Sequence, residues 1–133
     1  MTARQDTLQI QRDLEHRGIQ IDFDDVNALR RASLTLHGWA EVECGDTNDY
    51  ASTSIERDES TGKPFRCIYP HNSNTVTRYA IPDREAGALR RVAAICARVG
   101  LHYVHQGDPR GCALYVSKDP ITDGNYTNGV AIG

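Results

Sequence analysis

The spacing of apolar and polar positions predicts two helices in the first third of the chain. Apolar residues recur at helical intervals over residues 7–16, with Asp6 or Thr7 as the expected N-cap and Gly18 as the stop. The acidic segment that starts at Asp22 suits the positive end of a second helix, which we expect to run to about Glu43. The residues that mark its buried face are Val26, Leu29, Leu36 and Ala40.

A third helix is predicted over residues 84–99, where the helical spacing of apolar positions is the most regular in the chain. Asp83 is the expected N-cap, and Gly100 is expected to end the helix. The apolar residues at helical spacing are Leu89, Val92, Ala93, Cys96 and Val99.

The remaining segments have the β-branched and aromatic content that is typical of strands. The expected strands cover residues 52–57 (as an edge strand), 64–69, 75–81, 101–106 and 112–117, with residues 129–133 as a candidate last edge strand. The order is helix, helix, two or three strands, helix, hairpin. It predicts a single α+β domain over residues 1–133, with an antiparallel sheet of about four or five strands and helices packed on one face.

The charge balance changes the range of functions to consider. The chain has 15 basic and 18 acidic residues, a formal net charge of −3, so it lacks the basic surplus that is typical of general duplex binding. A local basic stripe remains, because Arg84, Arg91 and Arg98 recur every seven residues along the third helix. This stripe is either a solvated face or a docking site for nucleic acid or an acidic protein surface, so a DNA-binding regulatory protein stays an alternative.

The N-terminus contains no signal-peptide pattern and no apolar run is long enough to span a membrane, so we expect a cytoplasmic protein. Its cysteines should then be reduced, and no C-x-x-C pair indicates a zinc ribbon or a redox site. We expect buried free thiols at Cys44, Cys67, Cys96 and Cys112. No cofactor is predicted.

The most distinctive candidate site is the segment 105–116, HQGDPRGCALYV. The run from Asp108 to Gly111 has the signature of a type I turn that closes a hairpin. Turn formation does not require Arg110, whose guanidinium at the tip could bind a carboxylate or phosphate with two hydrogen bonds. The residues predicted to contact a partner are Arg110, Asp108, His105, Gln106, Tyr103, Arg84 and Arg91.

A second hypothesis is a small metal-dependent or nucleotide-handling enzyme. His37, Glu41 and Cys44 lie near one helical face and could ligate a metal, and the site would also use His105 and Asp108. This hypothesis requires the long helix and the last hairpin to converge. His102 and His105 should point to opposite faces of their strand, and the spacing of Cys67 and His71 is common by chance. No nucleophile elbow, P-loop or dinucleotide-binding glycine pattern occurs.

Three segments carry a resemblance to a known group of proteins: LHGWAE at residues 36–41, IPDREAGALRR at 81–91 and HQGDPRGCALY at 105–115. Over residues 30–116 the chain resembles small uncharacterised proteins of tailed phages, prophages and other bacterial mobile elements. No catalytic residue follows from that resemblance. It implies a non-enzymatic accessory protein that binds a host protein or nucleoprotein complex, such as a component of CRISPR or another defence system.

Overall fold

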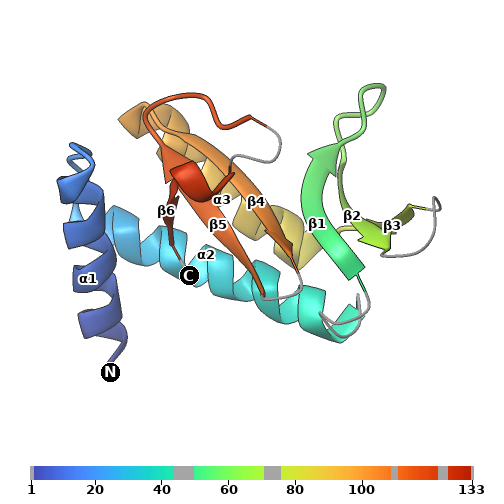
Figure 1. Cartoon of the computed structure of the whole chain (residues 1–133), viewed down its shortest axis with the longest axis horizontal. Helices are drawn as coiled ribbons and strands as arrows, with labels where there is room; N and C mark the ends of the chain where they lie inside the picture. The colour runs from blue at the N-terminus through green and yellow to red at the C-terminus, as the bar shows by residue number, and fades with distance from the viewer. Residues whose placement is uncertain (1, 44–49, 71–75, 109–110, 123–125, 133) are drawn as a thin grey trace.

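The computed structural model describes residues 2–43, 50–70, 76–108, 111–122 and 126–132 (Figure 1). The described residues form three α-helices, a short 3-10 helix and a six-stranded antiparallel sheet, which confirms the α+β fold and adds a strand to the expected number. The elements are α1 (Ala3–His16), α2 (Phe23–Glu43), β1 (Tyr50–Arg57), β2 (Pro64–Pro70), β3 (Thr77–Ala80), α3 (Asp83–Val99), β4 (His102–Asp108), β5 (Gly111–Ser117), η2 (Tyr126–Asn128) and β6 (Val130–Ala131).

The strand order is β3-β2-β1-β4-β5-β6, so the prediction of an edge position for β1 is wrong. β1 is central, between β2 and β4. Its residues Thr53 and Ser54 are buried and hydrogen-bonded: the Thr53 hydroxyl donates to the Cys67 carbonyl at 2.9 Å, and the Ser54 hydroxyl donates to the Glu56 carboxylate. The predicted last edge strand is confirmed as β6, which pairs with β5.

The predicted start residues of two helices are also corrected. α1 begins at Ala3, because Thr2 and Gln5 form a capping box there, and Thr7 is instead a fully buried residue inside the helix. α3 has Pro82 as its N-cap, without a side-chain cap, and Asp83 lies in the first turn. At that position its charge still interacts favourably with the positive end of the helix. Gly100 ends α3 in the left-handed conformation, as predicted (φ 76°).

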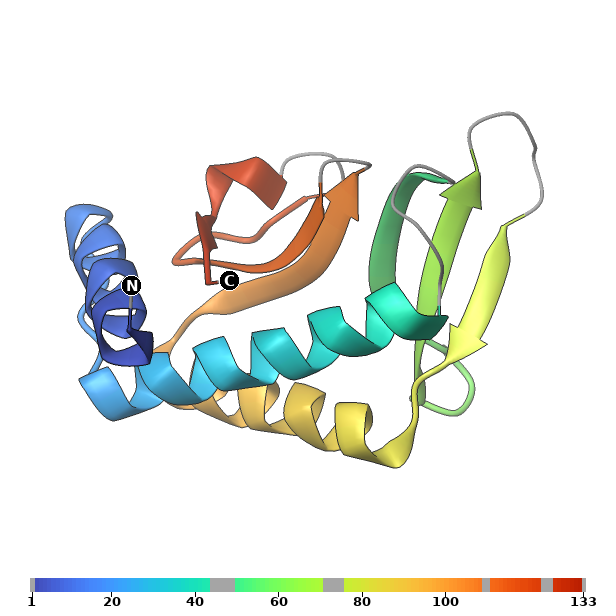
Figure 2. The ribbon, with the colours of Figure 1, turned by 90° about the horizontal axis from the view of Figure 1, so that it is seen from below.

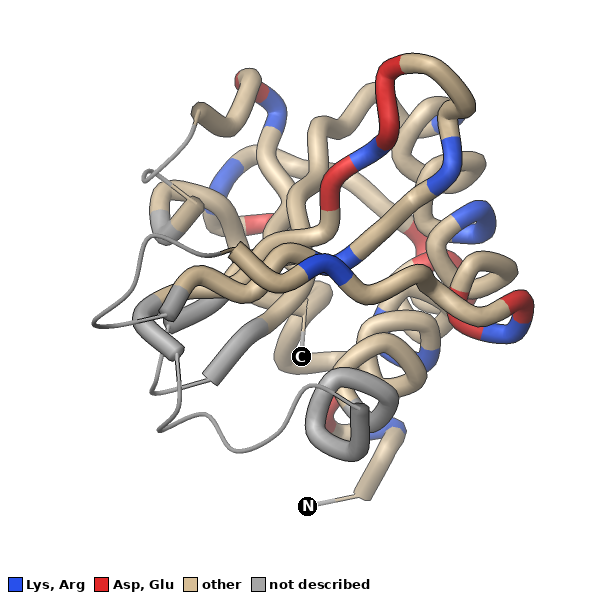
Figure 3. The backbone as a smooth tube through the Cα atoms, turned by 90° about the vertical axis from the view of Figure 1, so that its right-hand side faces the viewer, with Lys and Arg blue, Asp and Glu red and all other residues tan. Residues whose placement is uncertain are grey.

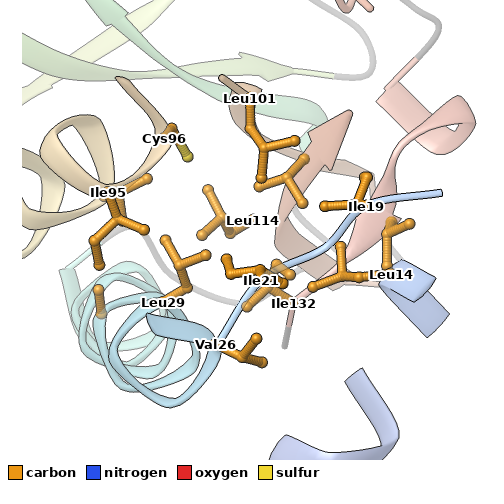
Figure 4. Packing of buried hydrophobic residues seen from close by; sticks show 14 of the residues in the cluster. Leu14, Ile19, Ile21, Val26, Leu29, Ile95, Cys96, Leu101, Leu114 and Ile132 are labelled. Carbon is orange, nitrogen blue, oxygen red and sulfur yellow. The ribbon is translucent and has the colours of Figure 1, made fainter. Parts of the chain in front are cut away.

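The helices α2 and α3 lie side by side along one face of the sheet, below β4 and β5 (Figure 2). Apolar side chains from all three helices and from β5 and β6 meet between these layers (Figure 4). Val26, Leu29 and Leu36 are fully buried, as their spacing predicts. α1 joins through Leu14, which is also fully buried.

The opposite face of the sheet is covered unevenly. Over β5, the ring of Tyr126 packs on that of Tyr115, with centroids 5.1 Å apart. Gly129 approaches so closely that a Cβ there would lie 3.0 Å from the carbonyl oxygen of Val116. Over β1, β2 and β3 none of the described helices covers this face (Figures 1 and 2). We call this uncovered part the open face.

Candidate functional site

The hairpin tip that the sequence singles out is only partly within the described residues. Asp108 pairs with Gly111, so the β4–β5 ladder runs up to the predicted turn. Pro109 and Arg110 lie outside the described residues, as does the side chain of Asp108. The contact predicted for Arg110 therefore stays a prediction.

The other predicted contact residues lie on three different surfaces. Gln106 is half-buried and pairs with Ser54 on the open face. His105 is opposite Leu114, a fully buried core residue, so His105 and Tyr103 belong to the helix side of the sheet. Arg84 and Arg91 are exposed on α3, whose buried residues face the sheet. The sheet and the helix layer therefore separate these two arginines from Gln106.

Beneath the sheet lies a buried polar cluster that the sequence analysis did not identify. Arg66, fully buried, donates from Nη1 to the Thr53 hydroxyl and from Nη2 to Nδ1 of His105, each at 3.1 Å. The sequence does contain an indication of this cluster. Arg66 lies inside the apolar strand PFRCIY, and a charged side chain that is buried there needs hydrogen-bond partners. What it bonds to depends on strand order, which the sequence did not reveal.

His105 is held neutral in this cluster. Complete burial, then the nearby charges of Arg66 and His37, keep the pKa of His105 well below 6.5. A guanidinium can only donate, so Nδ1 must accept and Nε2 must carry the hydrogen. Nε2 is buried and has no hydrogen-bond partner among the described residues.

The convergence that the enzyme hypothesis requires is met in part. His37 on α2 lies near enough to affect the pKa of His105 on β4. The side chains of Glu41 and Cys44 lie outside the described residues, and so does His71. Among the described residues no group of three His, Cys, Asp or Glu could hold a metal. His102 is exposed while His105 is buried, as their strand spacing predicts.

A second polar cluster, the open-face cluster, lies on the open face and centres on Glu56. Its carboxylate accepts from the Tyr69 hydroxyl at 2.7 Å and from the Ser54 hydroxyl at 2.9 Å. Partial burial opposes ionisation, but these bonds and one from Cys67 outweigh it and lower the pKa of Glu56. The bond to Glu56, with burial, raises the pKa of Tyr69 to about 12. On the adjacent strand, the Arg78 guanidinium lies 5.1 Å from the centroid of Phe65.

A pocket of about 190 Å³ opens where β1 and β4 diverge. Pairing between these strands is confined to Thr53 with Gly107 and Ser54 with Gln106. Residues 55–57 of β1 and 103–105 of β4 do not pair with each other, and they line the pocket together with Leu89 of α3. The lining residues of this fork pocket are Ile55, Glu56, Arg57, Leu89, Tyr103, Val104 and His105.

One arginine of the local basic stripe on α3 forms an ion pair with α2. Arg98 donates to both carboxylate oxygens of Asp25, at 2.6 and 3.0 Å, and so joins α3 to α2. Asp25 is therefore an interhelical contact as well as an acidic residue in the first turn of α2. Basic positions elsewhere are interspersed with acidic ones (Figure 3). Arg84 and Arg91 are the other exposed members of the stripe.

Two of the four cysteines are described, and both are free and buried, as predicted. Burial, then the neighbouring Glu56 carboxylate, raises the pKa of Cys67, and burial raises the pKa of Cys96 to about 11. Cys44 and the side chain of Cys112 lie outside the described residues. Thiols with a raised pKa are poor nucleophiles, so neither described cysteine fits a catalytic role.

Comparison of the chain with protein-family models, curated proteins and solved structures finds no match. Among the described helices, none is both long and apolar enough to cross a membrane. The function is therefore inferred from the geometry of the clusters and the fork pocket.

Proposed function

We propose that this chain is a small accessory protein of a bacterial mobile element that binds a host protein through its open face. One observation carries the proposal: the uncovered part of the sheet holds a hydrogen-bonded cluster of acidic, phenolic and hydroxyl groups beside an exposed arginine. The side chains are already fixed by one another. A partner therefore pays little conformational entropy to order them.

The chemistry of the open-face cluster favours a protein partner over a nucleic acid. Arginine and aromatic side chains such as Arg78, Phe65 and Tyr69 are enriched at protein interfaces. Glu56 is ionised and fixed in the middle of the cluster, where it would repel phosphate. A protein surface can instead offer donors to Glu56 and acceptors to Arg78.

The proposal is tested by site-specific cross-linking in a bacterial lysate. A photo-reactive phenylalanine analogue replaces either Ala80, exposed on β3 opposite Phe65, or Ala97, exposed on α3. We expect a discrete protein adduct, identified by mass spectrometry, from the Ala80 position and none from Ala97. Adducts of equal yield at both positions, or at Ala97 alone, would contradict the proposal.

The DNA-binding alternative is favoured by a different observation, the exposure of Arg84 and Arg91 on α3. It predicts nucleic-acid adducts at Ala97 that are removed by nuclease. It also predicts binding that falls steeply with salt, since phosphate contacts release counterions. Ala80 adducts would then be absent.

A further inference from the structure

A pocket of about 310 Å³ lies where the turn after α1 meets the end of β5. Arg17 and Ile19 line it from that turn, residues 116–122 from β5 and the segment after it, and Asn128 and Val130 from η2 and β6. We call it the end pocket. Small-molecule sites usually measure about 300–1,000 Å³, so its volume suits a small ligand.

The floor of the end pocket is apolar. Val116 is fully buried, and Ile19 and Val130 are buried too, so each shows the pocket only a small part of a core side chain. Ile121, half-buried, adds another apolar wall. A cavity of about 150 Å³ holds a benzene ring, so this pocket has room for a ring and a short chain. An apolar group gains free energy by leaving water for such a surface.

Two cationic side chains line the same pocket. Arg17 donates from Nη1 to the carbonyl oxygen of Asn128 at 3.0 Å, which joins its guanidinium to another wall of the pocket. The ammonium of Lys118 lies close to Gly18, where an added Cβ would be 3.3 Å from Nζ. Among the described residues neither cation forms an ion pair with a carboxylate. An anion in the pocket would therefore be attracted by two positive charges that the fold leaves uncompensated.

The charge balance of the pocket favours a single negative charge. Asp119 also lines it, so Arg17, Lys118 and Asp119 together supply two positive charges and one negative charge. A phosphate dianion exceeds that balance and would be repelled by Asp119. A carboxylate carries one charge, and its planar shape matches a guanidinium, which has further N–H donors beyond the one that Asn128 accepts.

We propose that the end pocket binds a small monocarboxylic acid with an apolar body. The carboxylate binds Arg17 and Lys118, and the apolar body lies on Val116 and Val130. Both parts are required, because the cations and the apolar floor share one pocket. The proposal goes beyond the proposed function and is independent of it, since no lining residue belongs to the open-face cluster or the fork pocket.

The test uses hydrocinnamate, which has one ring and one carboxylate, and hydrocinnamamide as the matched uncharged probe. Each is titrated into the full chain and followed by NMR at the backbone amides of residues 17–19 and 128–130. We expect saturable shifts, with hydrocinnamate binding about tenfold tighter than the amide, because hydrogen bonds between charged groups are the stronger ones. Equal affinities would overturn the role of the cations, and absence of saturable shifts would overturn the site.

Two further probes examine the two parts of the ligand. Propionate lacks the ring and should bind at least about tenfold more weakly than hydrocinnamate, because it buries less apolar surface. Phenyl phosphate, a dianion at about pH 8, should bind more weakly than hydrocinnamate. Propionate binding as tightly would show that the apolar floor takes no part, and tighter binding of phenyl phosphate would overturn the choice of a carboxylate.

Three variants assign the effect to named side chains. Arg17→Gln and Lys118→Gln, both at exposed positions, should each weaken hydrocinnamate binding about tenfold and leave hydrocinnamamide binding unchanged. Arg12→Gln, exposed on α1 and outside the pocket, is the matched control and should change neither. Asp119→Asn should tighten hydrocinnamate binding about threefold, because it removes a repelling charge. Hydrocinnamate binding that is equal in Arg17→Gln, Lys118→Gln and Arg12→Gln would overturn the proposal.

Discussion

The two halves of the sheet are stabilised differently. Beneath β4 and β5 the buried residues are almost all apolar and come from the three helices, from β5 and β6 and from the connections next to them. In β1 and β2 the buried residues include Thr53, Ser54 and Arg66, which are held by hydrogen bonds. The half beneath β4 and β5 is therefore stabilised mainly by apolar packing. The half formed by β1 and β2 holds buried polar groups in fixed positions by hydrogen bonds.

This division explains where the candidate sites lie. An apolar core gains stability without directional contacts, and it leaves few groups that recognise a ligand. A hydrogen-bonded cluster adds less net stability but fixes donors and acceptors in space. The open-face cluster and the fork pocket both belong to the polar half or its border.

The largest expected effect comes from breaking the apolar half. Leu29→Ala should lower the free energy of unfolding by about 3 kcal/mol, because it removes a fully buried side chain and leaves a cavity. Leu34→Ala is the matched control, since Leu34 on the same helix is 50% exposed, and its effect should be within about 0.5 kcal/mol. Urea denaturation measures both. Equal losses would show that α2 does not bury Leu29 as described.

Breaking the polar half should cost somewhat less. Arg66→Met keeps much of the side-chain volume but removes the donors to Thr53 and His105, so we expect a loss of about 2 kcal/mol. Arg66→Lys should recover little of this loss, because an ammonium cannot reproduce the two-pronged geometry. The same denaturation experiment applies, and a neutral Arg66→Met would contradict the role of the buried cluster.

The pH dependence of the free energy of unfolding tests the buried polar cluster of Arg66 and His105. The pKa of His105 is well below 6.5 in the folded protein and about 6.5 in the unfolded chain, so the unfolded state binds the proton first. The stability that neutral His105 provides is present above pH 6.5 and is lost as the pH falls below it, by up to about 1.4 kcal/mol per pH unit. His105→Gln should remove this slope relative to wild type, measured by urea denaturation between about pH 4.5 and 7.5. An unchanged slope would show that His105 is not the responsible group.

The smallest effect is expected at the surface ion pair that joins the helices. Asp25→Asn should lower the thermal midpoint slightly at low salt, and the difference from wild type should shrink in about 1 M NaCl, because Arg98 is 60% exposed and screened. The hydrogen bond from Arg98 also lowers the pKa of Asp25, so the contribution should disappear as the pH falls through that pKa. A large, salt-independent loss would require a buried role for Asp25.

Local patterns were sufficient for much of the fold. The helical spacing of α2 and α3 identified the buried faces, and Gly100 marked a helix end, because these features depend on neighbours within a few turns. The β4–β5 hairpin followed from residues adjacent in sequence. Asp83 was misassigned because Pro82 fits the N-cap geometry without a side-chain bond.

The sites were harder to predict. Tyr103, His105 and Gln106 were named as one contact surface, yet alternation along β4 sends Gln106 to the open face and His105 to the core. Glu56 and Tyr69 gave no motif, because their bond joins neighbouring strands and depends on the register of β1 with β2.

The sequence by itself determined the α+β class, the amphipathic helices and the turn signals, since each depends on short-range periodicity and backbone preference. Only the tertiary structure decided that β1 is central, that Arg66 reaches His105, and that β1 and β4 diverge to leave a pocket. The physical reason is that strand order and register bring together residues that are distant in the chain, such as Arg66 and His105, 39 positions apart, and local patterns do not specify which distant groups will meet.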